Sequence, residues 1–266
     1  MKKLVYTAAV FTMLLGFASC DKTETPTPTT PTTPTNPTTP TTAGPQPVMP
    51  APSGNNLSGA LISLKMKYST QPMGAPMPVT MESEMGMAIF YDNAGSSTKV
   101  DAGTVSVNSN DLEKKQDLSY FKWAYAGATP DDLDFSSGSN WNVGSSSAVT
   151  AFTYNDNSTF PKYIGNMPTS ITKSNGVTLT FNNSSLTGAD SVYVVIASGS
   201  ANVTKSFAAN AGTVTISAGD LSSLSVVSDN SAVFEVCPFR WSQVTKNGKN
   251  YVFIKEEAVV GNININ

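Results

Sequence analysis

The segment Lys246-Asn247-Gly248-Lys249 separates two runs of strand-forming residues, Val233 to Cys237 and Tyr251 to Lys255. Asn-Gly is the preferred pair at the centre of a tight hairpin turn, because both residues tolerate the positive φ angles that the turn needs. The two runs are therefore predicted to pair as an antiparallel hairpin. Apolar and polar residues continue to alternate through residues 259–265, so the chain is predicted to end on a strand.

The same pattern extends through most of the chain on the N-terminal side of this hairpin. Period-two alternation occurs at 64–68, 105–107, 177–181 and 214–216, and residues 192–196 form a continuous apolar run of strand length. No long stretch has the periodicity of a helix. Short strands joined by Gly, Asn and Ser predict an all-β protein, an antiparallel β-sandwich of immunoglobulin-like type. We expect an N-terminal β region at 55–160 and an immunoglobulin-like sandwich at 161–266.

The first residues have the composition of an export signal. A basic start and an apolar run from Leu4 to Phe17 predict a signal peptide at 1–19, too short to span a bilayer as a permanent helix. Phe17-Ala18-Ser19-Cys20 resembles a bacterial lipobox, with Phe17 where leucine is usual. The resemblance implies cleavage before Cys20 and a diacylglycerol and an N-acyl chain on that residue, which together anchor a protein stably in a membrane. The alternative is an ordinary signal peptide that leaves Cys20 as a thiol.

Residues 20–54 read as a spacer that follows the lipidated cysteine. The segment is nearly all Thr and Pro, with almost nothing that could pack in a core, so we expect a disordered linker. Proline favours extended conformations of about 3.1 Å per residue, which gives a reach of up to about 100 Å. Dense Thr beside Pro is typical of O-glycosylated stalks, and a bare solvated linker is the alternative.

Two further features resemble surface lipoproteins of the Bacteroidota. Asp21 and Glu24 are similar to the acidic export signal that follows the acylated cysteine in those proteins. The segments 171–178, 188–192 and 211–217 resemble the C-terminal region of uncharacterised Bacteroidota surface lipoproteins. The resemblance implies a lipid-anchored protein of the outer membrane, exposed at the cell surface, and it implies no activity.

Composition excludes several functional classes. Charged residues are 13% of the chain, about half the usual share, which favours an extracellular β-protein. Arg240 is the single arginine and there is no basic stripe, so nucleic acid is not expected as a partner. The absence of histidine excludes imidazole-based hydrolase triads and imidazole-based zinc or copper sites. With Cys20 acylated, Cys237 is the remaining cysteine, so no internal disulfide is expected and Cys237 is predicted to be a buried small residue.

Carboxylate chemistry is the one catalytic class that the composition leaves open. A glycoside hydrolase needs two acidic residues on either side of a sugar, and Glu82, Glu84, Glu235 and Glu256 are candidates. No spacing marks out a pair among them, and the alternative is that they are solvated surface or strand-edge charges. No organic cofactor is predicted.

Two clusters suggest metals. Asp131, Asp132 and Asp134 place oxygen ligands on one loop, which predicts a calcium site, although the spacing is not that of an EF-hand and a solvated acidic turn is the alternative. Met73, Met77, Met81 and Met85 are spaced by four and could bind Cu(I), but interspersed prolines exclude a continuous helix there, so core filling or a loop is the other interpretation.

Phe121, Trp123 and Tyr125 alternate along one predicted strand. A row of aromatic faces on a sheet can stack against sugar rings, whereas the alternative is that the row fills the core. We therefore expect a surface lipoprotein with a binding or adhesion role, in its leading form polysaccharide capture, rather than an enzyme. A structural or fimbrial-type envelope component, and a carboxylate-based glycoside hydrolase, are the alternatives. The expected partners are the membrane, through the anchor, and a polysaccharide or an envelope protein.

Overall fold

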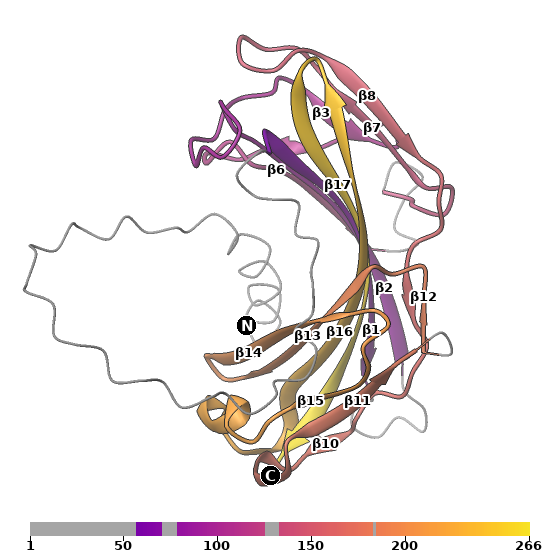
Figure 1. The fold of residues 1–266 in the computed structure, drawn as a ribbon, viewed down its shortest axis with the longest axis vertical. Coiled ribbons are helices and arrows are strands. Elements are labelled where there is room, and N and C mark those ends of the chain that lie inside the picture. The colour runs from indigo at the N-terminus through magenta and orange to yellow at the C-terminus, as the bar shows by residue number, and fades with distance from the viewer. Residues whose placement is uncertain (1–56, 71–78, 126–132, 183–184) are drawn as a thin grey trace, which may run out of the picture. The chain divides into compact units, whose positions relative to one another are not determined.

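The computed structural model describes residues 57–70, 79–125, 133–182 and 185–266, which form an almost entirely β structure (Figure 1). A nine-stranded sheet is the largest element. In spatial order its strands are β14 (Ala201–Ala208), β13 (Ser191–Ser198), β16 (Val227–Lys246), β17 (Lys249–Ile265), β1 (Gly59–Thr70), β2 (Val79–Phe90), β6 (Tyr120–Tyr125) and β5 (Glu113–Lys114), with β10 (Ser170–Ile171) also paired to β17. Pairing is antiparallel except where β1 and β10 run parallel to β17.

Three smaller sheets accompany the large one. The first has four strands and the other two have two strands each. They are β4 (Asn110–Asp111), β3 (Val105–Val107), β7 (Ser139–Val143) and β8 (Phe152–Asp156); β11 (Val177–Phe181) with β15 (Gly212–Ile216); and β12 (Leu186–Thr187) with β9 (Lys162–Tyr163). Two short 3-10 turns, η3 (Lys173–Asn175) and η4 (Asp220–Ser223), are the helical elements of the described residues.

The predicted hairpin turn is confirmed, but the two predicted runs do not pair with each other: residues 251–254 pair with 241–244, and residues 233–236 pair with 259–262. Lys246 pairs with Lys249, and the turn residues Asn247 and Gly248 have φ values of 51° and 76°. These positive angles match the right-handed twist of the two long strands that the turn joins. The pairing of β16 with β17 is interrupted at Cys237 and Pro238, because proline has no N–H to donate.

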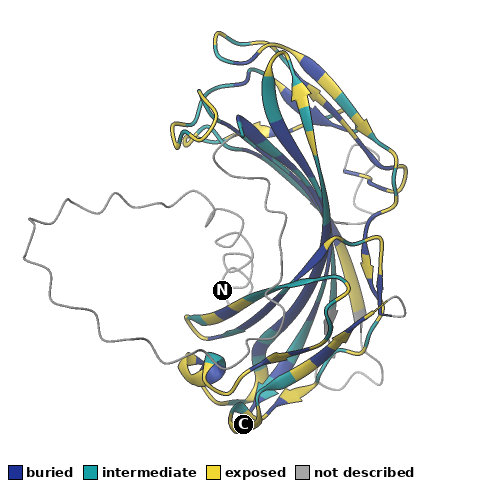
Figure 2. Cartoon of the chain, in the orientation of Figure 1, coloured by how far each residue is buried: buried dark blue, intermediate teal, exposed yellow. Residues whose placement is uncertain are grey.

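One face of the nine-stranded sheet, here called the core face, packs against the smaller sheets. Because side chains alternate along a strand, β17 contributes Tyr251 and Phe253 to a first core and Ile263 and Ile265 to a second one. The rings of Phe152 on β8 and Tyr251 on β17 have centroids 4.6 Å apart. In the four-stranded sheet buried residues alternate with exposed ones, as along β7 (Figure 2).

The expected all-β architecture with antiparallel sheets in a sandwich-like arrangement is confirmed. The first core takes its residues from 61–160 together with two from β17, and the second takes its residues from 163–236 together with two from β17. The long strand β17 thus contributes buried residues to both cores, whereas β16 contributes them to the second core and packs the partly buried Val244 against the first. The predicted signal peptide and linker lie outside the described residues.

The other side of the nine-stranded sheet, here called the opposite face, is also apolar. Eight buried hydrophobic residues belong to neither core, and the strand registers place all of them on this face. They are Leu64, Met85, Val195, Cys237, Phe239, Val252, Ala258 and Val260.

Candidate ligand-binding cleft

Between the two cores, the core face of the nine-stranded sheet changes from apolar to charged. Side chains alternate between the two faces along β1. Every second residue after Leu61, which belongs to the first core, therefore lies on the core face. The charged residues on this stretch of the core face are Lys65 and Lys67 on β1, Glu82 and Glu84 on β2, and Lys255 and Glu257 on β17. The sheet therefore has a polar waist between its two apolar halves.

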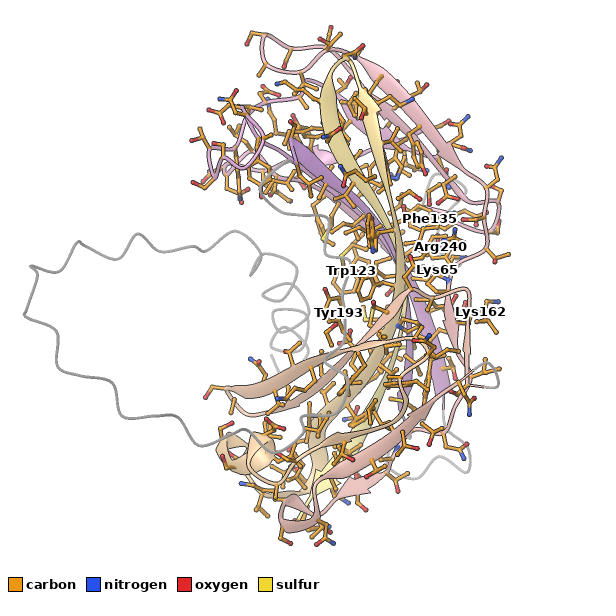
Figure 3. All side chains as sticks on the ribbon, in the orientation of Figure 1. Lys65, Trp123, Phe135, Lys162, Tyr193 and Arg240 are labelled. Carbon is orange, nitrogen blue, oxygen red and sulfur yellow. The ribbon has the colours of Figure 1, made fainter. Side chains whose placement is uncertain are left out.

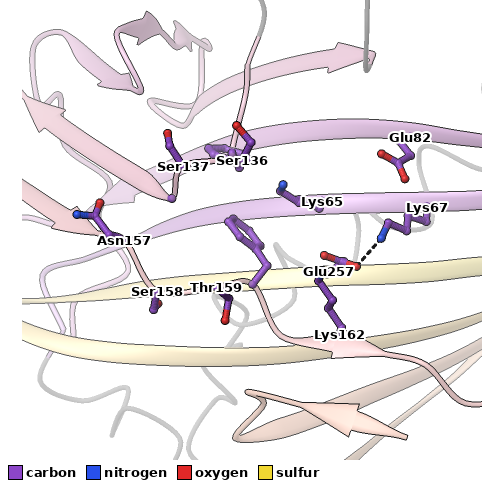
Figure 4. Close-up of a pocket in the computed structure, with 13 residues that line it drawn as sticks. Lys65, Lys67, Glu82, Ser136, Ser137, Asn157, Ser158, Thr159, Lys162 and Glu257 are labelled. Atoms are coloured by element: carbon purple, nitrogen blue, oxygen red, sulfur yellow. Dashed lines mark hydrogen bonds and ion pairs between the residues drawn. The ribbon is translucent and has the colours of Figure 1, made fainter.

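A cleft of about 360 Å³ opens over this waist (Figure 4). This volume is at the small end of the range found for ligand pockets in proteins. Its lining combines charged side chains with hydroxyl, amide and aromatic groups. The lining residues are Lys65, Lys67, Glu82, Phe135, Ser136, Ser137, Gly138, Asn157, Ser158, Thr159, Phe160, Lys162 and Glu257.

Two ion pairs lie at the floor of the cleft. Lys67 Nζ donates to Glu257 Oε1 at 2.8 Å, and this hydrogen bond raises the pKa of Lys67 (Figure 4). Lys65 Nζ lies 3.3 Å from Glu84 Oε1. Burial raises the pKa of Glu84, although Lys65 and the N–H of Phe135, which donates to Glu84 at 2.6 Å, both oppose that shift. The pairs present donors and acceptors side by side.

Lys255 holds one wall of the cleft in place. Its Nζ donates to the carbonyls of Asp156 and Ser158, both at 2.7 Å, and lies 3.2 Å from Asp156 Oδ1. The Phe160 ring lies 5.1 Å from the Nζ atoms of both Lys65 and Lys255. Burial lowers the pKa of Lys255, an effect that Asp156 opposes. The segment 156–160 is thus tied to β17 by one buried ammonium group.

Replacing this ammonium group is expected to be costly. Lys255→Met removes the donor to two carbonyls and leaves Asp156 without its cation, so we expect a loss of about 2–4 kcal/mol in the free energy of unfolding. Urea denaturation monitored by circular dichroism measures it. Lys114→Met is the control, because Lys114 forms an exposed pair with Asp101 that contributes less than about 1 kcal/mol. Equal effects of the two substitutions would contradict the role assigned to Lys255.

Asn108 holds the second wall of the cleft. Its Nδ2 donates to the carbonyls of Asp134 and Gly138 at 2.5 and 2.8 Å, and its Oδ1 accepts the N–H of Asn140 at 2.7 Å. Gly138 has a φ of 109°, and a Cβ placed there would lie 2.5 Å from the carbonyl oxygen of Asp156. Glycine is therefore required where the two walls approach each other.

The predicted aromatic row lies away from this cleft. Phe121 and Trp123 are half-buried on β6, opposite Met87 and Met85 of β2, and therefore lie on the opposite face. Figure 3 shows Trp123 and Tyr193 on the other side of the sheet from Lys65 and Phe135. Neither Phe121 nor Trp123 belongs to a core. The side chain of Tyr125 lies outside the described residues.

The four candidate glutamates are separated by the sheet. Glu82 and Glu84 lie on the cleft side, whereas Glu235 and Glu256 are buried on the opposite face. The interpretation as solvated charges is wrong for Glu235 and Glu256, because only 6% and 5% of their surfaces are exposed. Burial raises the pKa of Glu235 to about 7 and that of Glu256 to about 8. The predicted burial of Cys237 is confirmed, and burial raises the pKa of its thiol.

Only some of the predicted metal ligands belong to the described residues. Asp131, Asp132, Met73 and Met77 lie outside the described residues. Asp134 is exposed and accepts the N–H and hydroxyl hydrogens of Ser136, at 2.7 and 3.0 Å. Within the described ranges, no group of three or more Cys, Asp or Glu residues is arranged to hold a metal ion.

Sequence reasoning missed the cleft residues Lys65, Lys67, Asn157 and Lys255. A signal was present in Lys255-Glu256-Glu257, three charges in the middle of an otherwise apolar strand pattern. Charged residues within an apolar strand indicate a place where no apolar layer packs against the sheet.

No helix in the described part of the chain has the length and hydropathy of a membrane span. The chain matches no protein-family model, no curated protein and no solved structure.

Proposed function

We propose that this protein is a lipid-anchored receptor of the outer cell surface that binds a saccharide unit of a polysaccharide in the cleft between its two cores. The observation that carries the proposal is the lining of the cleft, which combines the ion pair of Lys67 and Glu257, hydroxyls and an amide with two phenylalanine residues. Each sugar hydroxyl donates and accepts hydrogen bonds, and each sugar ring also has an apolar face. The lining offers hydrogen-bonding groups for the sugar hydroxyls and phenylalanine rings for the apolar face.

The walls support this use because they are fixed by internal bonds. Asn108 and Lys255 bind the backbone carbonyls of the two wall segments, so the side chains of Ser136, Ser137 and Asn157 are free of that task. A preorganised wall reduces the entropy lost when a ligand binds. The lipobox at Cys20 and the Thr/Pro linker suit a receptor that stands off a membrane, and we propose a surface location on that basis.

Two structural details favour binding over the alternatives. The edge strand β14 carries Lys205, which forms an ion pair with Asp220 of η4 at 2.6 Å. A charge at an edge strand discourages strand addition, so fimbrial-type assembly through this edge is disfavoured. Glu257 in the cleft lining is bound to Lys67, and Glu84 on the same face of the sheet is paired with Lys65, an arrangement that suits hydrogen bonding better than acid and nucleophile chemistry.

The proposal is tested by measuring the binding of the full-length protein in detergent to an array of neutral and acidic polysaccharide fragments, followed by calorimetry. Asn157→Ala combined with Ser137→Ala removes two exposed polar groups of the cleft and is expected to weaken binding by about tenfold. Asn202→Ala, an exposed change on β14, is the matched control and should leave affinity unchanged. If no fragment binds, or if the double variant binds as tightly as the original protein, the proposal fails.

A further inference from the structure

The single arginine of the chain is not one of the lining residues, but it lies next to the lysine that holds one wall of the cleft. Arg240 is on β16, directly opposite Lys255 of β17, and therefore on the core face. Figure 3 shows it on the same side of the sheet as Lys65, Phe135 and Lys162. Its side chain is half-buried, and no hydrogen bond or ion pair joins its guanidinium to another residue of the described ranges.

The neighbouring cations already have their own acids. Lys255 is paired with Asp156 and Lys65 with Glu84, whereas Arg240 and Lys65 both act to lower the pKa of Lys255. Like charges directly opposite each other on adjacent strands are destabilising. Arg240 thus adds a positive charge that is not paired with an acid among the described residues, while the exposed carboxylate of Glu82 is an unpaired negative charge at the cleft.

A second cation of the same kind lines the cleft itself. Lys162 on β9 is exposed, and within the described residues its ammonium group forms no hydrogen bond or ion pair. A guanidinium has a planar fork of donors that fits carboxylate and sulfate oxygens with two parallel hydrogen bonds, and an ammonium adds a point charge. Together the guanidinium of Arg240 and the ammonium of Lys162 supply positive charge and hydrogen-bond donors for an anionic ligand.

We infer that the ligand of the cleft is an acidic saccharide, one that carries a carboxylate or a sulfate group, with Arg240 binding the anionic group and Lys162 providing a second positive charge. This inference rests on the proposed function, since it specifies which saccharides the cleft selects. Both anionic groups share the chemistry that Arg240 recognises, so the probes must distinguish between them.

The test is calorimetry on the full-length protein in detergent with four probes of equal length. These are an oligogalacturonate, a neutral galacto-oligosaccharide, a chondroitin sulfate oligosaccharide and its desulfated form. We expect at least one acidic probe to bind about tenfold or more tightly than a neutral one, and its affinity to fall when NaCl is raised from about 50 to about 300 mM. Preference for the galacturonate or for the sulfated probe identifies the group, and either preference supports the inference.

Substitutions then locate the anion. Arg240→Gln is expected to remove most of the preference for the acidic probe, Arg240→Lys to retain part of it, and Lys162→Gln to reduce it severalfold. Lys246→Gln, on the same strand, is the matched control, and thermal melting checks that each variant is folded. If neutral and acidic probes bind equally, or if Arg240→Gln keeps the preference, the inference is wrong and the proposed function stands. If no probe and no array fragment binds, the proposed function fails with it.

Discussion

Raising the pH from 5 to 9 is expected to lower the free energy of unfolding of this protein by several kcal/mol. Glu235 and Glu256 are buried on the opposite face, where burial raises their pKa values to about 7 and about 8. In the unfolded chain both groups ionise near pH 4.3. Between these values the folded state holds protons that the unfolded state has lost, so stability is full below the unfolded pKa and falls as the pH rises through the folded values.

The size of the fall follows from the linkage relation. Each group costs about 1.4 kcal/mol for every pH unit between its unfolded and folded pKa, so the two together give a loss of several kcal/mol by pH 8. The described titratable neighbours on this face are Cys237, Tyr193 and Tyr68, and burial raises the pKa of the first two above their ordinary values. None of the three supplies a positive charge to the two carboxyl groups.

Urea denaturation at intervals from pH 5 to pH 9 measures this effect. Glu256→Gln keeps a neutral group of the same shape, and we expect it to flatten the profile and to be more stable than the original protein at pH 9. Glu82→Gln is the control, because Glu82 is exposed on the cleft side of the sheet. A profile that is flat in the original protein, or equally steep in Glu256→Gln, would show that Glu256 ionises in the folded state as it does in water.

Truncating Phe234 is expected to cost about 3–5 kcal/mol of stability. Its side chain is fully buried in the second core, on β16, where it faces Ile196 of β13 and Gly261 of β17. Phe234→Ala leaves a cavity that the rigid strand pairs on both sides cannot close. Val226→Ala, at a residue that is 65% exposed, is the control and should change stability by less than about 0.5 kcal/mol.

The same variant tests whether the two cores unfold together. Because β17 contributes to both cores and is paired with β16 along most of its length, damage to the second core should also destabilise the first. Trp141 lies in the first core, whereas Trp123 and Trp241 belong to neither core, so in a background with Trp123→Phe and Trp241→Phe the fluorescence of Trp141 reports the first core, and circular dichroism reports all strands. We expect the two signals to shift together in Phe234→Ala. Fluorescence that stays at its original midpoint while circular dichroism shows an earlier step would mean that the two cores unfold independently.

Local sequence patterns predicted the strands but not their surroundings. In Leu64-Lys65-Met66-Lys67-Tyr68 the alternation correctly separates two faces. It does not say which face the rest of the protein covers, and the usual interpretation places the lysines in solvent. In the structure the lysines lie on the core face, in the gap between the two cores, whereas Leu64 is buried on the opposite face.

The acidic residues illustrate the same limit. In the sequence, Glu82 and Glu235 both occur in strand-like segments and nothing local distinguishes them. In the structure the first is exposed beside the cleft and the second is buried. The difference arises from strand register, because a shift of one residue would exchange the two faces. The ion pair between Lys67 and Glu257, 190 residues apart in the chain, likewise depends on the parallel pairing of β1 with β17.

The sequence by itself determined the all-β class, the hairpin at Asn247-Gly248 and the burial of Cys237, because these depend on turn geometry, side-chain alternation and residue chemistry that act over a few residues. Only the tertiary structure decided that Arg240 lies opposite Lys255, whose ammonium group holds one wall of the cleft, and that Glu256 is buried. Those positions depend on pairings between strands far apart in the chain, whose register is selected by the burial of both cores at once.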